Sequence, residues 1–242
     1  GQIVKRAIGV CYYPEQWPEA YWEDDIRRMK SLGISWVRIG EFLWSQIEPE
    51  PYYYDFSLLD QIFEIIGKYG LKVVLGTPTA APPAWLIDLY PGMLPIDQFG
   101  TIRQFGSRRH YNFCSKDFVI HCEALVRKMA ERYGKNPNLG AWQIDNEYGC
   151  HETVTSYDPE TLKTYQKWLE EKFSAKLPTN IKPISKLNKS WGNDFWSMNY
   201  ISFDQIGFPI NCVTEPNPSH LASFLLFASD QVKKFNKRQV NI

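Results

Sequence analysis

The stretch Trp142-Gln143-Ile144-Asp145-Asn146-Glu147 reads as a buried strand that ends in an amide and a carboxylic acid. Tyr148 and Gly149 follow it and are typical of a turn. In a parallel α/β protein, side chains at the carboxyl end of a strand meet the substrate. Glu147 is therefore a candidate general acid, and Asn146 is a candidate hydrogen-bonding partner for a substrate hydroxyl group. The alternative is a capped strand end whose glutamate is only solvated.

A helix–glycine–strand pattern precedes this stretch and occurs three times. A glycine ends each predicted helix and an apolar strand follows it: Gly33 before 34–39, Gly70 before 71–75 and Gly134 before 139–145. Another strand is predicted over 7–12, before a first helix over 19–32. Strands that are apolar almost throughout are typical of a parallel sheet covered on both faces. The pattern therefore predicts βα units on a parallel sheet.

The remaining segments are less regular. Ser57-Leu58-Leu59-Asp60 resembles a capping box at the start of the second helix. Three more helices are predicted, over 117–133, from Asp158 to about 173 and over 220–240. Two long connections show no strand periodicity, namely the proline-rich loop 77–115 and the segment 176–218.

Four strand–helix units favour part of a barrel over an open sheet. A closed (β/α)8 barrel of the TIM type needs ~250 residues, and long insertions use that length here on half of the strands. In an open doubly wound sheet we would expect a glycine-rich phosphate loop after the first strand, where Cys11-Tyr12-Tyr13-Pro14 lies instead. We therefore expect an α/β fold in which residues 1–242 form the N-terminal portion of a (β/α)8 catalytic domain that stops before strand five.

The composition argues against several classes of partner. Lys plus Arg and Asp plus Glu number 27 each, so the net charge is zero and a nucleic-acid partner is not expected. No apolar run approaches the ~18 residues that a membrane span needs, and the N-terminus lacks the apolar stretch of a signal peptide. The five cysteines are widely spread and form no C-x-x-C pair, which favours reduced thiols in a cytoplasmic protein.

The predicted strand ends should meet at one mouth. They contribute Tyr12-Tyr13, Arg38-Ile39-Gly40-Glu41-Phe42, Gly76-Thr77-Pro78 and Asn146-Glu147, and the third loop adds Arg108-Arg109-His110. A cleft lined by acids, an amide, arginines and aromatic rings suits a neutral polyhydroxylated ligand better than a phosphate.

Five motifs resemble glycoside hydrolase family 42, in order and over nearly the whole chain. They are Val10-Cys11-Tyr12-Tyr13-Pro14-Glu15-Gln16-Trp17, Arg38-Ile39-Gly40-Glu41-Phe42-Leu43-Trp44, Gly76-Thr77-Pro78-Thr79-Ala80-Ala81-Pro82-Pro83, Phe105-Gly106-Ser107-Arg108-Arg109-His110-Tyr111 and Trp142-Gln143-Ile144-Asp145-Asn146-Glu147-Tyr148-Gly149-Cys150-His151. The resemblance implies a retaining β-galactosidase on a (β/α)8 barrel, acting on terminal β-D-galactose. It also implies further domains and a homotrimer for the full-length protein.

Carried over by position, the resemblance assigns roles to three residues. Glu147 would be the acid/base, Asn146 would bind the sugar at its 2-hydroxyl, and Arg108 would be a further sugar-binding residue. Retaining hydrolysis needs one carboxylic acid that protonates the leaving oxygen and later deprotonates water. A strand-end glutamate shielded by aromatic rings suits that role because burial raises its pKa towards the working pH.

The second carboxylate of the mechanism has no counterpart in the sequence. A retaining enzyme places a nucleophile ~5–5.5 Å from the acid, and in this family it lies on the seventh strand. Glu41 is the best-placed other acid, but a structural or binding role in which it pairs with a nearby arginine is preferred over that of nucleophile, and Glu215 has no motif around it. We therefore expect the chain by itself to be catalytically inactive. The alternatives are a related β-glycosidase such as an α-L-arabinosidase, and a non-catalytic truncated fragment that binds sugar.

Zinc is not expected, although some members of the family carry a four-cysteine structural site. Their first ligand lies just after the Arg-Arg-His-Tyr motif, where this chain has Asn112, with Cys114 displaced by two residues. Cys150 is present, but Cys212 is the next cysteine. A closed zinc site requires four closely arranged ligands. We therefore expect no metal and no cofactor.

Several aromatic side chains near the mouth remain ambiguous. Trp44, Trp85 and Trp142 could stack on a sugar, but core packing is the preferred reading for each. His110 and His151 could bond substrate or support residues that do.

Overall fold

The structure is a computed structural model that describes residues 7–107, 111–144 and 155–242. Four parallel strands form one sheet in the order β1-β2-β3-β4. Their bounds are β1 (Gly9–Cys11), β2 (Trp36–Ile39), β3 (Lys72–Gly76) and β4 (Leu139–Gln143). The strands are neighbours in sequence order, without the reversal that defines a doubly wound sheet. This order confirms the prediction of consecutive βα units.

Helices connect and cover these strands in what we call the βα region, the described residues between 7 and 144. They are α1 (Trp22–Ser31), α2 (Trp44–Ile47), α3 (Ser57–Lys68), α4 (Ala84–Leu89) and α5 (Lys116–Tyr133). Single 3-10 turns also lie in this region, at η1 (Pro14–Gln16) and η2 (Glu19–Tyr21) before α1 and at η3 (Pro78–Ala80) and η4 (Pro91–Met93) on either side of α4. After α1 the chain turns at Gly33, whose φ of 81° is the left-handed conformation expected at a helix end.

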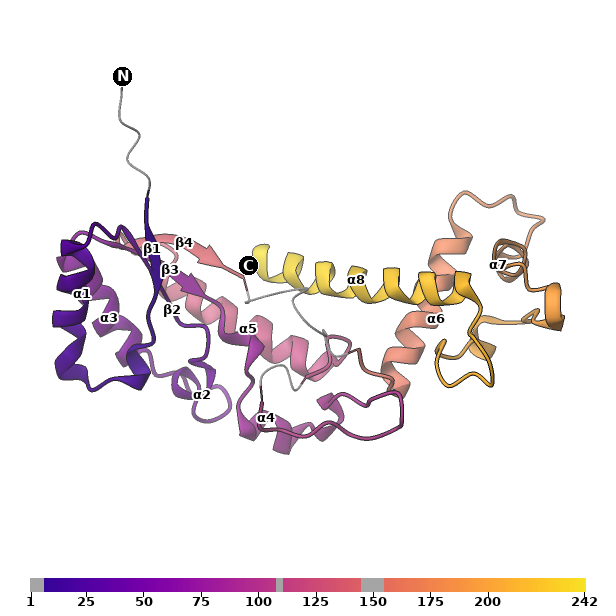
Figure 1. Cartoon of the computed structure of the whole chain (residues 1–242), viewed down its shortest axis with the longest axis horizontal. Coiled ribbons are helices and arrows are strands. Elements are labelled where there is room, and N and C mark those ends of the chain that lie inside the picture. The colour runs from indigo at the N-terminus through magenta and orange to yellow at the C-terminus, as the bar shows by residue number, and fades with distance from the viewer. Residues whose placement is uncertain (1–6, 108–110, 145–154) are drawn as a thin grey trace, which may run out of the picture.

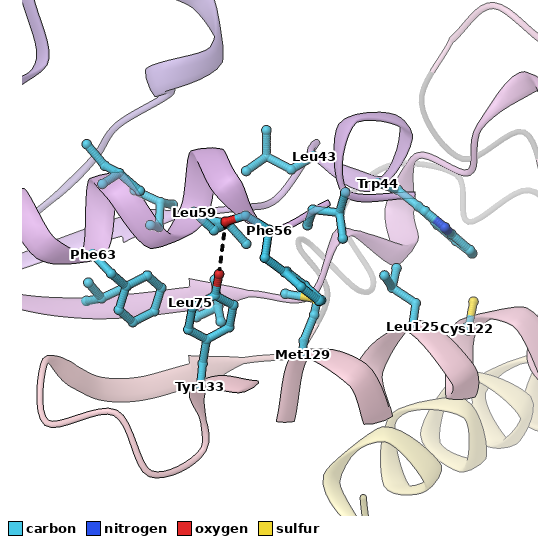
Figure 2. Close-up of a cluster of buried hydrophobic side chains, with 14 of the residues drawn as sticks. Leu43, Trp44, Phe56, Leu59, Phe63, Leu75, Cys122, Leu125, Met129 and Tyr133 are labelled. Carbon is cyan, nitrogen blue, oxygen red and sulfur yellow. Dashed lines mark hydrogen bonds between the residues drawn. The ribbon is translucent and has the colours of Figure 1, made fainter. Parts of the chain in front are cut away.

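The core of the βα region lies between the sheet and its helices. Helix α3 buries Leu59, Ile62, Phe63 and Ile66 at the three- and four-residue spacing of one helix face. Figure 2 shows Phe63 and Tyr133 side by side, and their ring centroids are 4.5 Å apart. The hydroxyl of Tyr133 donates to Oδ1 of Asp60 at 2.8 Å, and the backbone oxygen of Phe56 lies 3.4 Å away, as the dashed line in Figure 2 marks, so its polar end is satisfied.

The second part of the chain, which we call the helical region, comprises residues 155–242. Its helices are α6 (Pro159–Ser174), α7 (Pro183–Trp191) and α8 (Pro218–Val240), with 3-10 turns at η5 (Phe195–Ser197) and η6 (Phe203–Gln205). Asp158 caps α6 by accepting a hydrogen bond from the Thr161 amide, as its sequence predicts. Residues of all three helices form a separate, mainly aromatic core around Tyr165, Trp191 and Phe227.

Helix α8 joins the two regions. It packs against α6 and α7 at its start and against α5 further along, and its C-terminal end lies beside the sheet (Figure 1). Phe224 and Phe227 belong to the helical core, whereas Phe235 belongs to the core of the βα region. One helix therefore contributes to both cores.

Three local predictions differ from the structure. Ser57 is the first residue of α3 and not its cap, since its amide and hydroxyl bond the carboxylate of Asp55 upstream. The predicted loop 77–115 contains α4, and the segment 176–218 contains α7. Helix α7 begins at Pro183, a residue that also marks turns, and has only nine residues, which is short for periodicity to reveal.

None of the helices within the described residues is both long enough and apolar enough to span a membrane.

Candidate active site

The three residues to which the sequence assigns roles, Arg108, Asn146 and Glu147, lie outside the described residues, as do Arg109, His110, Cys150 and His151. The structure describes the framework from which they extend. Gln143 ends β4, four positions before Glu147 in the sequence. The carboxyl ends of four parallel strands share one edge of the sheet, which is the edge where an active site of this architecture forms.

Arg38 ties together the ends of two strands that are not neighbours. From β2 its Nη1 donates to Oε1 of Gln143 on β4 at 2.8 Å, across β3. Its Nε lies 2.5 Å from Oε1 of Glu41. The amide of Thr77 donates to the carbonyl oxygen of Gln143 at 2.9 Å. The last residue of β4 is therefore held through both its side chain and its backbone.

Glu41 is buried, with only 2% of its surface exposed. Its side chain lies over Gly76 of β3, where a Cβ atom would come within 3.0 Å of Cγ of Glu41. The glycine is required for this close approach. The expectation that Glu41 pairs with a nearby arginine is confirmed by its contact with Arg38. Because its carboxylate is buried and paired with Arg38, Glu41 is poorly placed to attack a substrate.

Two adjacent tyrosines after β1 point in different directions. Tyr12 is buried and donates from its hydroxyl to Oδ2 of Asp25 on α1 at 2.7 Å, so it belongs to the sheet–helix interface. Tyr13 stacks on Phe42, with ring centroids 5.9 Å apart. Burial and the negative charge of Glu41 raise the pKa of Tyr13. Of the two, Tyr13 lies beside the acidic end of β2.

Glu15 is a half-buried acid near the same strand ends, and sequence reasoning missed its environment. Burial raises the pKa of its carboxyl, and the charge of Glu41 acts in the same direction. Its Oε2 is inaccessible to water and has no hydrogen-bond partner among the described residues. Glu15 belongs to one of the motifs that resemble the family, but no sequence pattern indicates that its carboxyl is desolvated.

The three tryptophans near the predicted mouth contribute to core packing, the role preferred from the sequence. Trp44 is fully buried and donates to Oε1 of Glu48 at 2.9 Å, and Trp85 donates to the carbonyl oxygen of Glu48 at 2.8 Å. Glu48 itself is completely buried and also accepts from the amide of Tyr52. This acid organises the loop after β2 and is closed to a substrate. Trp142 on β4 is partly buried against the core.

The end of α8 also reaches the strand ends. Gln239 is buried, and its Nε2 lies 3.5 Å from Oγ1 of Thr79, which follows β3. Residues 160 positions apart thus meet at this edge. The sequence predicted helix α8 but gave no signal for the place where it ends.

Asn112, which stands where some family members have a zinc-binding cysteine, takes part in a hydrogen-bond network. Nδ2 of buried Asn112 donates to Oδ1 of Asp158 at 2.8 Å and lies 3.1 Å from Oγ1 of Thr161. Oδ1 of Asn112 accepts from the amide of Cys114. Burial raises the pKa of the Cys114 thiol to about 11. Among the described residues, no group of three His, Cys, Asp or Glu side chains could hold a metal ion.

The sequence predicts reduced thiols, and four of the five cysteines are described. Among the described residues, Cys11, Cys114, Cys122 and Cys212 form no disulfide bonds, and Cys150 lies outside the described residues.

Comparison with known proteins places the chain among enzymes. A family model described as beta-galactosidase, of glycoside hydrolase family 42, matches residues 11–242. A β-galactosidase of Thermus thermophilus is 48% identical over 235 residues, which cover 97% of this chain and 35% of that protein. The crystal structure of a β-galactosidase from the psychrophilic Marinomonas ef1 superposes with a TM-score of 0.91 at 50% identity, covering 98% of this chain and 35% of that one. A β-galactosidase from the Antarctic haloarchaeon Halorubrum lacusprofundi gives a TM-score of 0.91 at 41% identity. The chain therefore spans about a third of the length of these relatives.

Proposed function

We propose, from the premise that the chain belongs to the β-galactosidases of glycoside hydrolase family 42, that it forms the N-terminal portion of the catalytic barrel of a retaining β-galactosidase. The reaction is hydrolysis of terminal non-reducing β-D-galactose residues. The fold class agrees with this premise, because the four-stranded parallel sheet and its helices form part of a (β/α)8 barrel. The observation that carries the proposal is the family match over residues 11–242.

In the proposed mechanism Glu147 is the acid/base. It protonates the glycosidic oxygen as the bond breaks and then, as a carboxylate, takes a proton from the water that releases the sugar. Asn146 hydrogen-bonds the sugar at its 2-hydroxyl, and Arg108 binds it further. The attachment of Gln143 to Arg38 and Thr77 supports this assignment, because it fixes the strand from which Asn146 and Glu147 follow.

The nucleophile is proposed to lie outside the chain. Among the described acids, Glu41 is paired with Arg38, Glu48 is closed to solvent, and burial raises the pKa of Glu15, which disfavours the carboxylate that a nucleophile needs. Glu215 is exposed in an irregular segment. The chain alone should therefore not turn over a galactoside. The full-length protein is proposed to act as a homotrimer, as the family suggests. It is proposed to act in the cytoplasm, a location that reduced thiols favour.

A chimera tests the proposal. The matched third of the Thermus thermophilus β-galactosidase is replaced by this chain, and hydrolysis of 4-nitrophenyl β-D-galactopyranoside and 4-nitrophenyl α-L-arabinopyranoside is measured. We expect the galactoside to be preferred, and Glu147→Gln to lower kcat by about 10²–10⁴. Asn146→Ala and Arg108→Ala should each lower kcat and raise KM. Lys186→Gln, on the surface of α7, serves as the control.

Two results would contradict the proposal. Preference for the arabinoside in the chimera would assign the chain to a related glycosidase. Robust hydrolysis of the galactoside by the isolated chain would show that a complete pair of carboxylates is already present.

A further inference from the structure

A groove between α5, α6 and α8 collects positive charge from three helices. Its volume is about 870 Å³. Six cationic side chains line it: Lys116, Lys163, Lys167, Lys234, Lys237 and Arg238. All six residues are exposed, and the chain as a whole has no net charge. The positive charge is therefore a local property of this groove.

The cations on each helix share one face. Lys163 and Lys167 are one turn apart on α6, and Lys234, Lys237 and Arg238 have the three- and four-residue spacing of neighbours on α8. Like charges at this spacing repel one another. The arrangement costs free energy unless an anion lies between the helices.

The acids that line the groove do not neutralise it. Oε1 of Glu123 lies 3.7 Å from Nη1 of Arg238, and Oε1 of Glu160 accepts from the backbone amide of Lys116 at 3.4 Å. None of the five lysines forms an ion pair with a carboxylate of the described residues. The positive groups therefore face the groove with only one partner between them.

Helix stability accounts for only some of these cations. Lys237 and Arg238 lie in the last turn of α8, where positive charge is favourable to the helix dipole. Lys116 is the first residue of α5, where positive charge is unfavourable, and Lys163 lies near the start of α6. Their placement opposite α8 is better explained by what the groove binds.

We propose that this groove binds an anion that carries several linked phosphate groups. Ammonium groups from three sides provide compact point charges that suit phosphate oxygens, whereas planar carboxylates are better recognised by arginine forks. The volume lies within the range of small-molecule sites. Phe113, Val119 and Phe235 form an apolar floor, which strengthens electrostatic attraction by excluding water.

Inorganic tripolyphosphate is the probe, used with the purified chain in metal-free buffer at low ionic strength. Isothermal titration calorimetry should show one site whose affinity falls as salt rises, and the melting temperature should increase with probe concentration. The charge-reversed variant Lys234→Glu/Lys237→Glu should bind more than about tenfold more weakly. The variant Lys163→Gln/Lys167→Gln, on a different helix, should also lose affinity and covers the case that the first variant fails to fold.

The matched control is Lys186→Glu/Lys189→Glu, which makes the same charge change on exposed positions of α7. It should bind as the unaltered chain does. Absence of binding at low ionic strength, or an equal loss in the control, would overturn the proposal. Binding of poly-glutamate without binding of tripolyphosphate would also overturn it, because it would identify an acidic peptide as the partner.

Discussion

The βα region and the helical region bury their cores in different ways. The first packs aliphatic residues of the sheet, such as Val37, Val73 and Leu75, against helix faces with regular spacing. The second packs aromatic rings on one another, with the centroid of His220 4.6 Å from that of Trp191. Ring contacts between distant segments occur in both cores, such as that of Phe63 with Tyr133 in the first, but only the first core also contains strand faces that follow from the periodicity of the chain. Helix α8 nevertheless contributes to both, so we expect the two regions to unfold together.

Paired core truncations should have the largest effect on stability. Ile66 of α3 and Leu169 of α6 are both fully buried, one in each core. Ile66→Ala and Leu169→Ala should each lower the free energy of unfolding by ~2–5 kcal/mol. Urea denaturation followed by circular dichroism should show a single transition shifted by either variant, whereas Leu225→Ala, on the exposed face of α8, should shift it little. Two transitions, each moved by only one variant, would separate the regions.

Removal of the arginine that ties β2 to β4 should come next. Arg38→Met leaves the buried carboxylate of Glu41 without its ion pair to Arg38 and removes the hydrogen bond to Oε1 of Gln143, and should cost about 3 kcal/mol. The double variant Arg38→Met/Glu41→Gln should recover part of the loss. Arg27→Met is the matched control, because its pair with Asp24 is exposed and should contribute less than about 1 kcal/mol. Equal losses for Arg38→Met and Arg27→Met would remove the special role of the strand-end contact.

Acid should destabilise the helical region through His220. Burial lowers the pKa of this histidine to about 4, and a hydrogen bond to the backbone of Gly207 only partly opposes the shift. As the pH falls, His220 of the unfolded chain therefore becomes protonated near pH 6.5, whereas His220 of the folded chain becomes protonated only near pH 4. This contribution to stability is complete above pH 6.5 and is lost as the pH falls towards 4, by up to about 3 kcal/mol.

Denaturation curves between pH 7 and pH 4 measure this effect. His220→Phe, which keeps a ring between Trp191 and Tyr165, should flatten the dependence. His121 in the βα region, whose pKa is also lowered by burial, leaves a residual slope in that variant. An unchanged slope in His220→Phe would show that the helical region does not sense acid through this residue.

The smallest predicted effect tests a polar contact between the regions. Asn112→Ala removes the side chain that links the segment before α5 to Asp158 and Thr161 at the start of α6. The loss should be about 1–2 kcal/mol, because it leaves buried polar groups without a partner. Asn199→Ala removes an exposed bond to Asp194 and should cost much less. Equal thermal shifts for the two variants would place the coupling of the regions elsewhere.

The same contrast explains what the sequence could and could not predict. Strands such as 71–75 and the cap at Asp158 depend on neighbouring residues, so a local pattern revealed them. The bond from Arg38 to Gln143 joins residues 105 positions apart, and the contact of Gln239 with Thr79 joins residues 160 apart. Neither leaves a periodic signal, because such contacts follow from how the helices close over the sheet.

For the candidate site, motifs that resemble the family identified more residues than periodicity or charge patterns did. The roles of Glu147, Asn146 and Arg108 rest on a family resemblance, and the family itself is confirmed over residues 11–242. The pairing of Glu41 with an arginine was predicted and is confirmed. The desolvation of Glu15 was not predicted, because burial of a single carboxyl is a property of the assembled loops.

Azide rescue of the Glu147→Ala variant tests the assignment of the acid/base most directly. In the chimera with the Thermus thermophilus β-galactosidase, and with 2,4-dinitrophenyl β-D-galactopyranoside, the good leaving group needs no acid, so a galactosyl-enzyme forms and accumulates. Azide needs no general base, and we predict that it restores turnover and yields β-galactosyl azide. Turnover that azide does not affect, or a product of α-configuration, would contradict the role of Glu147 as the acid/base of a retaining enzyme.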